Sequence, residues 1–333
     1  MSAIGLRAPA APAAGLRGPV RVLLRQHRRS LWAAGALLVL GIAIVVGLRI
    51  WVAAASSAER CADGDITRCG DGSYLSTYAR SHTESYLASG GTAALLLAGL
   101  IGVFVAGPLI ARELESGTFR LAWAQSASPA QWLAARLALP AALATAGMTI
   151  LVLVYRWGWS GIRSNPHASG LSWFQSGIHP ALGPTAVAYA LLAVAVGALC
   201  AVVVRRTVLS MSLTALVLGT VMLGFGKRRY ELWPTVRAVR ALGGDYPSGD
   251  AWYTESGMLT ASGKEIYSKD CIPAGSAESF TSCLRNRGGI TGFVDYHPAS
   301  HFWPLQLVET GILLVLAAAA VALAFRVLRR RHG

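Results

Sequence analysis

The sequence predicts an all-α membrane protein that crosses the bilayer six times, with an N-terminal interfacial helix and a large extracellular loop between the fifth and sixth helices. Of its 333 residues, 54% are hydrophobic and only 14% are charged, whereas about 25% are charged in a soluble domain. The apolar residues form long runs, and the arginines behind the net charge of +14 stand beside those runs. That placement favours lipid headgroups over nucleic acid as their partner.

Six apolar runs are long enough to cross a hydrocarbon core of about 30 Å, which takes about 20 helical residues. They are Leu31–Ala55, Gly91–Ile110, Leu133–Tyr155, Pro184–Val204, Thr207–Phe225 and Leu305–Phe325. Residues 1–17 are expected to be a disordered tail, and residues 18–333 a single membrane domain. The predicted outer loops are 56–90, 156–183 and 226–304. The segment before the first run is long and arginine-rich, and no cleavage site follows the run closely, which indicates that the run is a retained anchor.

The stretch "PVRVLLRQHRRS", which precedes the first run, has the pattern of a short helix in the headgroup layer. Val20, Leu23 and Leu24 share one helical stripe, and the arginines lie mostly opposite. Such a helix is favoured, and a simple extension of the first span is the alternative.

Arginine counts predict the orientation of the spans. With six spans, the arginines of the N-terminal tail, the Arg205-Arg206 turn and the C-terminal tail all fall on one side. That side is expected to be the cytoplasm, so both termini of this multi-pass plasma-membrane protein lie inside. Lys227 and the two arginines after it are an exception, because they fall on the outer side. They begin a long loop, however, and the rule applies only to loops of up to about 60 residues.

The cysteines agree with that orientation. Cys61, Cys69, Cys271 and Cys283 fall in outer loops, and Cys200 falls inside the fourth span. Cysteines on an oxidising face predict disulfides, and short loops favour the local pairs Cys61–Cys69 and Cys271–Cys283. Free thiols are the alternative.

Two outer stretches suggest metal sites only superficially. "ADGDITRCGDGS" resembles a calcium loop, but Arg68 and Tyr74 occupy positions where such a loop needs Gly and Glu. We expect an acidic, disulfide-closed turn there. His297 and His301 have a helical spacing, but Pro298 lies between them, so a structural pair is favoured over a metal site. "YELWPTVRAVRAL" has helical spacing on both sides of Pro234 and predicts short helices over the outer mouth.

The segment after the second span combines charge, glycine and aromatic residues in "GPLIARELESGTFRLAW". Ser116-Gly117 is expected to end the helix at the membrane surface. Ser128, Pro129 and Gln131 then predict a new helix that begins with a capping box. A short cytoplasmic element held by two spans suits a role in which a soluble partner acts on it.

Four stretches resemble the membrane subunit of type-2 ABC exporters, in particular an actinobacterial permease group. They are "GVFVAGPLIARELESGTFRLAWAQSASPAQWLAARL", "LLRQHRRSLW", "AYALLAVAVGALCAVVVRRTVLSMSLT" and "YHPASHFWPLQLVETGILL". The resemblance implies an ABC ATPase partner, which holds ATP and Mg²⁺, and a dimer with a second copy or a similar permease. It also implies that the segment after span two docks on the ATPase. The residues it assigns to that surface are Glu113, Glu115, Gly117, Thr118, Arg120, Trp123, Gln125 and Trp132.

That resemblance has one departure and one open point. The family often has basic residues just before the second Trp, where this chain has Pro129, Ala130 and Gln131. From spacing alone, it is as reasonable to interpret Glu113 and Glu115 as solvated surface acids as it is to give them a role. The resemblance favours a role in docking or in bracing within the subunit.

The chain lacks the sequence signatures of catalysis. It has no G-x-x-x-x-G-K-[ST], H-E-x-x-H or G-x-S-x-G motif, so we expect no catalytic residue, bound cofactor or metal, and place ATP hydrolysis on another chain. Arg49 and Glu309 lie within spans and invite a functional hypothesis; snorkelling, a mutual salt bridge and substrate contact all remain open. The alternative to a permease is a non-transporting membrane sensor or assembly protein.

Overall fold

The computed structural model describes residues 28–58, 72–124, 128–163, 171–241, 247, 250–271 and 277–332. The predictions for the N-terminal tail, for most of the interfacial helix, for Cys61 and Cys69, and for Gln125 lie outside the described residues. So does the calcium-like stretch apart from its last two residues.

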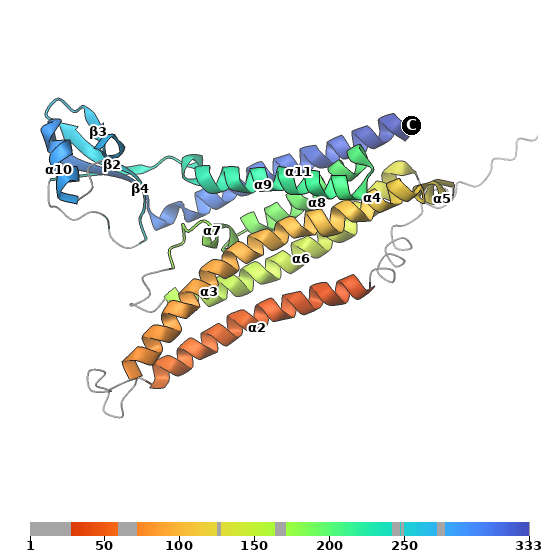
Figure 1. Ribbon diagram of the computed structural model, residues 1–333, viewed down its shortest axis with the longest axis horizontal. Helices are drawn as coiled ribbons and strands as arrows, with labels where there is room; N and C mark the ends of the chain where they lie inside the picture. The colour runs from red at the N-terminus through yellow and green to blue at the C-terminus, as the bar shows by residue number, and fades with distance from the viewer. Residues whose placement is uncertain are drawn as a thin grey trace, which may run out of the picture.

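Six helices in the described part are long and apolar enough to cross a membrane, as predicted, and they lie side by side in an elongated bundle (Figure 1). Two short helices occur in the segments that connect the long ones: α5 (Phe119–Ala124) and α7 (Ile178–Ala181). The long ones are α2 (Arg28–Ala58), α3 (Gly72–Leu100) with its continuation α4 (Gly107–Ser116), α6 (Pro129–Arg163), α8 (Thr185–Val204), α9 (Thr207–Arg228) and α11 (Phe302–His332).

The second and third spans extend beyond their apolar runs. α3 begins at Gly72, inside the predicted outer loop 56–90, and α6 continues to Arg163. These extensions pack on each other: Leu87 and Tyr155 are both buried, and the Tyr155 hydroxyl donates to the Leu87 carbonyl at 2.8 Å. Tertiary packing therefore keeps polar sequence helical where composition indicated a loop.

α8 is the centre of the bundle and α2 its periphery. Of the most apolar window in each span, 72% is buried in α8 and none in α2. α3 joins α4 through a π-helical turn, η1 (Ile101–Ala106), which crosses α8 closely. A Cβ on Gly197 would lie 2.6 Å from the Gly102 carbonyl oxygen. Small residues at this crossing thus allow the two backbones to meet, as expected for packed membrane helices.

The segment between α9 and α11 contains a small antiparallel sheet rather than the predicted short helices. Its strands β1 (Val236–Ala241), β2 (Trp252–Thr260), β3 (Glu265–Tyr267) and β4 (Gly289–His297) have the order β1-β4-β2-β3. Short 3-10 turns occur at η2 (Arg229–Leu232), η3 (Ser268–Cys271) and η4 (Ala299–His301). The fold is therefore mostly helical with one added sheet. The helical prediction for 230–242 is wrong beyond η2, because the chain pairs with β4 in the register Val236↔Tyr296.

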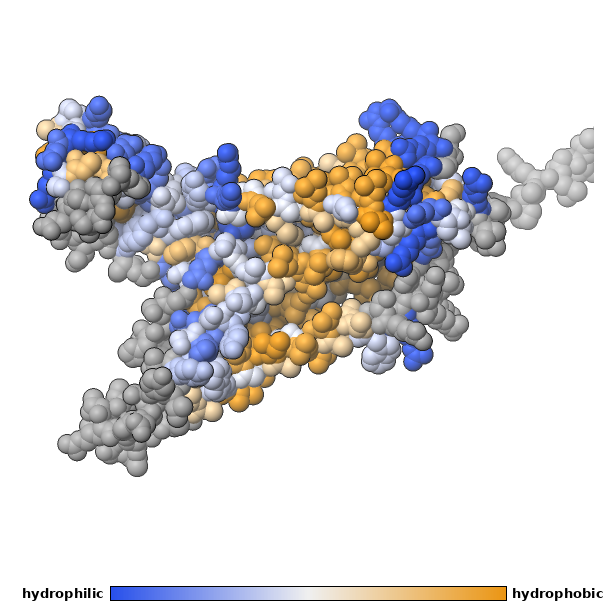
Figure 2. Space-filling model, in the orientation of Figure 1, coloured by the Kyte–Doolittle hydropathy of each residue, from blue (hydrophilic) through white to orange (hydrophobic). Residues whose placement is uncertain are grey.

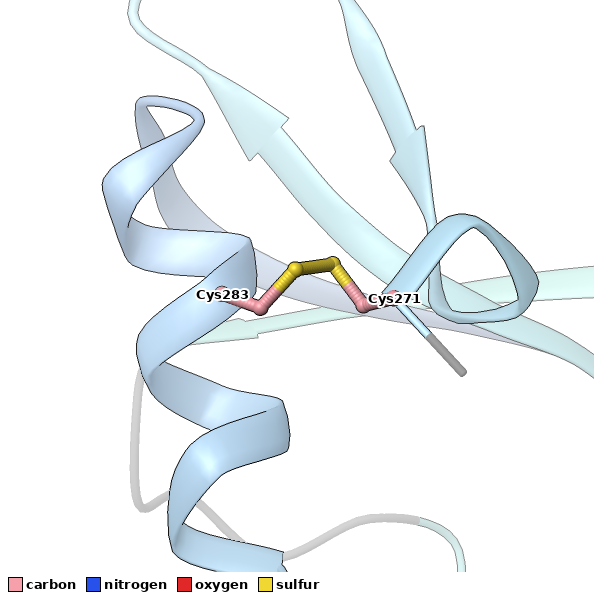
Figure 3. Close-up of a disulfide and its surroundings, with 2 residues drawn as sticks. All are labelled: Cys271 and Cys283. Atoms are coloured by element: carbon pink, nitrogen blue, oxygen red, sulfur yellow. A yellow bond between two sulfur atoms is a disulfide. The ribbon is translucent and has the colours of Figure 1, made fainter. Parts of the chain in front are cut away.

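One predicted disulfide is present beside this sheet (Figure 3). Cys271 in η3 is bonded to Cys283 in α10 (Ala277–Asn286), with the two Cα atoms 6.0 Å apart. Met258, Ile266 and Leu284 bury their side chains around it. The disulfide closes a small core that such a sheet cannot supply from apolar area alone.

The bundle has a hydrophilic region at each end. Hydrophilic residues gather at both ends of the visible face, and hydrophobic residues fill the band between them (Figure 2). We name the end with β1–β4 the sheet end, and the end with α5, the α8–α9 turn and the C-terminus the α5 end (Figure 1).

Candidate functional site

The α4–α6 connection, which the structure describes over residues 112–124 and 128–136, lies at the α5 end of the bundle. Gly117 ends α4 with φ of +74°, a left-handed conformation that glycine adopts without steric cost. The Arg120 N–H then bonds to the Gly117 carbonyl at 3.1 Å and starts α5. Ser116 and Thr118 close the turn with a hydroxyl contact of 3.0 Å. The predicted helix break is therefore confirmed.

The predicted capping box at the start of α6 is also present. The Gln131 N–H donates to the Ser128 hydroxyl at 3.2 Å, and the Ser128 N–H donates to the Gln131 side-chain oxygen at 3.1 Å. Pro129 occupies the first helical position. The reciprocal bonds satisfy donors that a helix start leaves free, so α6 begins at a fixed point of the connection.

Glu113 braces α4 against α6. The Trp132 indole N–H donates to one Glu113 carboxylate oxygen at 3.0 Å, and Arg136 forms an ion pair with the other. The Glu113 and Arg136 side chains are only 20% and 16% exposed. Charge-assisted bonds of this kind are stronger than neutral ones, so this carboxylate holds two helices together and is not a solvated surface acid.

Glu115 braces α4 against α9. Its carboxylate accepts the Thr207 backbone N–H at 2.9 Å and the Thr207 hydroxyl at 2.6 Å. A carboxylate at the N-terminus of a helix satisfies a free N–H and complements the helix dipole. Glu115 thus supplies the cap of α9 from another helix.

Aromatic side chains fill the inner side of α5. Phe119 meets Trp123 edge to face at 4.6 Å between ring centroids, and Trp123 meets Trp132 in the same way at 6.3 Å. Phe119 and Trp132 are buried. Thr118 and Arg120 are exposed. The residues assigned to docking by resemblance therefore fall into two sets. Some, such as Glu113 and Trp132, contact other helices of the same chain, whereas Thr118 and Arg120 are exposed.

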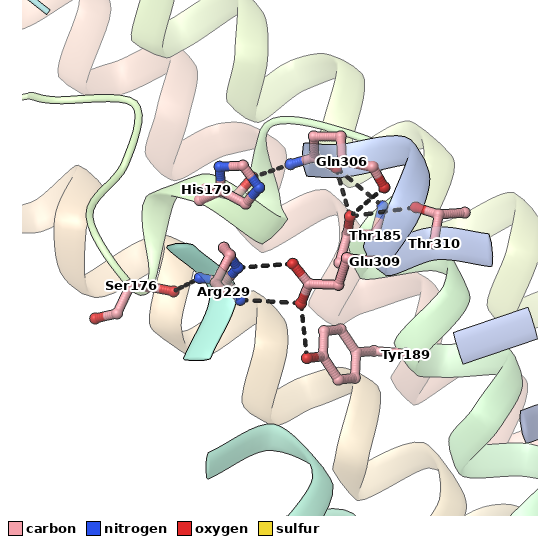
Figure 4. Close-up of polar contacts among 8 residues, drawn as sticks. All are labelled: Ser176, His179, Thr185, Tyr189, Arg229, Gln306, Glu309 and Thr310. Atoms are coloured by element: carbon pink, nitrogen blue, oxygen red, sulfur yellow. Dashed lines mark hydrogen bonds and ion pairs between the residues drawn. The ribbon is translucent and has the colours of Figure 1, made fainter. Parts of the chain in front are cut away.

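A buried polar cluster lies at the sheet end (Figure 4). Arg229 forms a two-pronged ion pair with Glu309, at 2.6 Å and 3.0 Å, and the Tyr189 hydroxyl donates to the same carboxylate at 2.8 Å. Arg229 also reaches the Ser176 carbonyl at 3.4 Å. The ion pair joins the connection after α9 to α11, while Tyr189 adds α8.

This geometry corrects the pairing considered for the two intramembrane charges. Arg49 does not contact Glu309: its guanidinium lies 4.0 Å over the Trp157 ring and donates to the Trp157 carbonyl at 3.2 Å. Glu309 is fully buried, so it does not snorkel to the headgroups. Its partner, Arg229, belongs to a basic run that the sequence places in a loop.

A second group of hydrogen bonds extends this cluster toward α7. The Thr185 hydroxyl contacts the Gln306 side-chain oxygen at 2.5 Å and the Thr310 hydroxyl at 3.2 Å. The Gln306 amide also donates to the His179 carbonyl. Burial, and to a lesser degree the Arg229 charge, hold the pKa of His179 well below its usual value. The imidazole is therefore neutral beside the ion pair.

His297 and His301 contact each other at the start of α11. Their Nδ1 atoms lie 3.1 Å apart, and His297 Nε2 contacts the Tyr230 carbonyl at 2.9 Å. Both His297 nitrogens therefore have protein partners. Across the described ranges, no three His, Cys, Asp or Glu side chains come together as metal ligands.

Comparison with known families agrees with this architecture. The family model described as "ABC-2 membrane transporter related" matches residues 33–228, which is more than half of the chain. The match covers all or nearly all of five of the six candidate spans and the whole α4–α6 connection, and it ends just before Arg229. No curated protein and no solved structure matches the chain.

Proposed function

We propose, because the chain belongs to the ABC-2 membrane transporter related family, that it is the transmembrane permease subunit of an ATP-driven exporter. In this proposal two permease subunits form the substrate path, and separate ATPase subunits bind ATP and Mg²⁺. The α4–α6 connection passes the movement of the ATPase to the spans. The bracing of this connection is the observation that carries the proposal.

The proposed orientation places the α5 end in the cytoplasm. Arg205, Arg206 and the arginines at the end of α11 lie there, beside the exposed Arg112 and Arg120. Such an excess of arginine marks the cytoplasmic side of short loops. The sheet end then faces outward, where its disulfide is stable.

The bracing suits a part that transmits force. Glu113 ties α4 to α6, and Glu115 ties α4 to α9. A load on α5 therefore displaces three helices together instead of bending the connection. α4 also continues through η1, which crosses the central helix α8 at Gly102 and Gly197. Packed helices move as units, which supports long-range transmission.

The exposed side of α5 is the proposed docking surface. Thr118 and Arg120 face solvent there, while Phe119 on the opposite side is buried. The capping box replaces the basic residues common in the family before the second Trp, so the contact is centred on α5 rather than on the start of α6. An Arg at this position suits an acidic cleft in the ATPase.

The experiment is coexpression with a Walker-motif ABC ATPase from the same genome, followed by copurification and measurement of ATP hydrolysis. We expect a stable complex whose hydrolysis responds to transported compounds, and Arg120→Glu should weaken it. Arg330→Glu is the matched control, because Arg330 is also exposed and lies on α11 at the same end. A chain that binds no ATPase would favour the sensor or assembly role instead.

A further inference from the structure

An open apolar groove lies between α6 and α11, with α8 as its floor. It has a volume of about 370 Å³, and its walls include Leu137 and Ala141 from α6, Val194 from α8, and Val321 and Phe325 from α11. α6 and α11 contact each other directly, so the groove is a furrow that runs along this helix–helix contact and is lined by apolar side chains. The groove therefore suits a thin, flexible apolar chain.

The length and depth of the groove match one leaflet of the bilayer. Along α11 its lining runs from Leu314 to Phe325, which at 1.5 Å per residue is about 16 Å. One leaflet contributes half of a hydrocarbon core of about 30 Å. On α11 the lining occupies the half of the apolar run Leu305–Phe325 that is nearer the α5 end, and the α6 lining begins at Ala134, near the start of that helix.

Positive charge stands at the α5 end of the groove. Arg329 follows Phe325 by one helical turn, so it lies on the same side of α11, and it is exposed. Ala130 precedes Ala134 by one turn and belongs to the first turn of α6, where the helix dipole favours an anion. Within the described part of the chain, Glu113 and Glu115 have partners elsewhere, and no salt bridge joins Arg329 to a carboxylate.

We propose that this groove binds one anionic phospholipid. One acyl chain lies along α8 between α6 and α11, and the phosphate lies against Arg329 and the start of α6. The apolar walls explain retention of the chain, and the unneutralised arginine explains selection of the headgroup. This site depends only on embedding in a membrane, so it stands or falls separately from coupling to an ATPase.

The test is native mass spectrometry of the full chain released from nanodiscs that contain equal amounts of phosphatidylglycerol and phosphatidylcholine with identical acyl chains. We expect one retained lipid, with phosphatidylglycerol preferred about fivefold, the factor expected for one arginine near a lipid headgroup. Arg329→Gln should keep the lipid but reduce the preference to near one. Arg326→Gln, an exposed neighbour on another side of α11, should keep the preference.

A variant that fills the groove with a larger side chain tests the proposal independently. Ala318 lines it, so Ala318→Phe should lose the retained lipid, whereas Val315→Phe on an exposed side of α11 should not. Equal retention of both lipids by the unmodified chain would overturn the proposal, as would lipid retention by Ala318→Phe. A dimer that dissociates only in Ala318→Phe would also overturn it, because the groove would then be an interface between copies. Arg329→Gln changes an exposed side chain and keeps the test valid if Ala318→Phe does not fold.

Discussion

Arg229 and Glu309 form an ion pair that is 2% and 0% exposed and joins the two chain segments that flank the small sheet. Arg229 lies in η2, where the chain leaves α9, and Glu309 lies on α11, where the chain returns. Tyr189 of α8 donates to the same carboxylate. The sheet is thus fixed at its base to the central helix of the bundle.

Removing one partner of this pair should destabilise the protein strongly. Glu309→Leu leaves the Arg229 charge buried, and we expect a loss of about 3–5 kcal/mol, the usual cost of breaking a buried pair. The double variant Arg229→Met with Glu309→Leu should recover most of it. The measurement is thermal unfolding in detergent. Arg49→Met is the control, and its effect should add to that of Glu309→Leu. Equal losses in the single and double variants would contradict the pairing.

The cysteines should form two local disulfides. Peptide mapping without reductant is expected to link Cys271 to Cys283, as the structure has them, and Cys61 to Cys69. Replacing Cys271 and Cys283 by Ser should destabilise the sheet by about 2–4 kcal/mol, with little effect on the spans. Free thiols at these four positions, or links between the two loops, would refute this prediction.

The orientation of the bundle can be measured with reporter fusions. Fusions after Arg206 and after His332 should report a cytoplasmic location, and a fusion after Ser262, in the β2–β3 turn, an external one. The reason is the concentration of arginine at the α5 end. A cytoplasmic signal at Ser262 would reverse the orientation and remove the oxidising surroundings of the disulfide.

The turn at Gly117 should be more important for coupling than for folding. Gly117→Val forces a β-branched residue into a left-handed conformation, which is strongly disfavoured, yet no atom lies within 4 Å of its Cβ. We expect normal membrane expression with weaker ATPase association or lost transport. Gly147→Ala, also in open space but within helix α6, is the control. Full coupling in Gly117→Val would show that the angle of α5 is unimportant.

The membrane part of the fold was readable from the sequence because burial in lipid demands long apolar helices. Local chemistry also predicted the break at Gly117 and the capping box of α6. The sequence does not predict the extension of α3 to Gly72, since its polar residues resemble a loop and packing on α2, α6 and α7 keeps them helical. The β1 strand was missed because "VRAVRAL" suits either period and its pairing with β4 joins distant residues.

The sequence also does not identify Arg229 as the partner of Glu309. Lys227, Arg228 and Arg229 form one basic run, and only the third is buried. Nothing in the run distinguishes them, because the 3-10 turn after α9 decides which side chain points inward. A carboxylate in an apolar span did invite a functional hypothesis, and a salt bridge was one of its three open outcomes, with Arg49 rather than Arg229 as the partner considered. The bracing by Glu113 and Glu115 similarly depends on helices that meet only in the folded chain.

The most direct test of the account is site-specific photo-cross-linking from α5 in native membranes. A photoreactive residue in place of Arg120 should cross-link to a Walker-motif ATPase in a manner that depends on ATP, because the exposed side of α5 is the proposed docking surface. The same residue in place of Lys264, at the sheet end, should not. An absence of ATPase adducts from position 120, or equal adducts from both positions, would contradict the account.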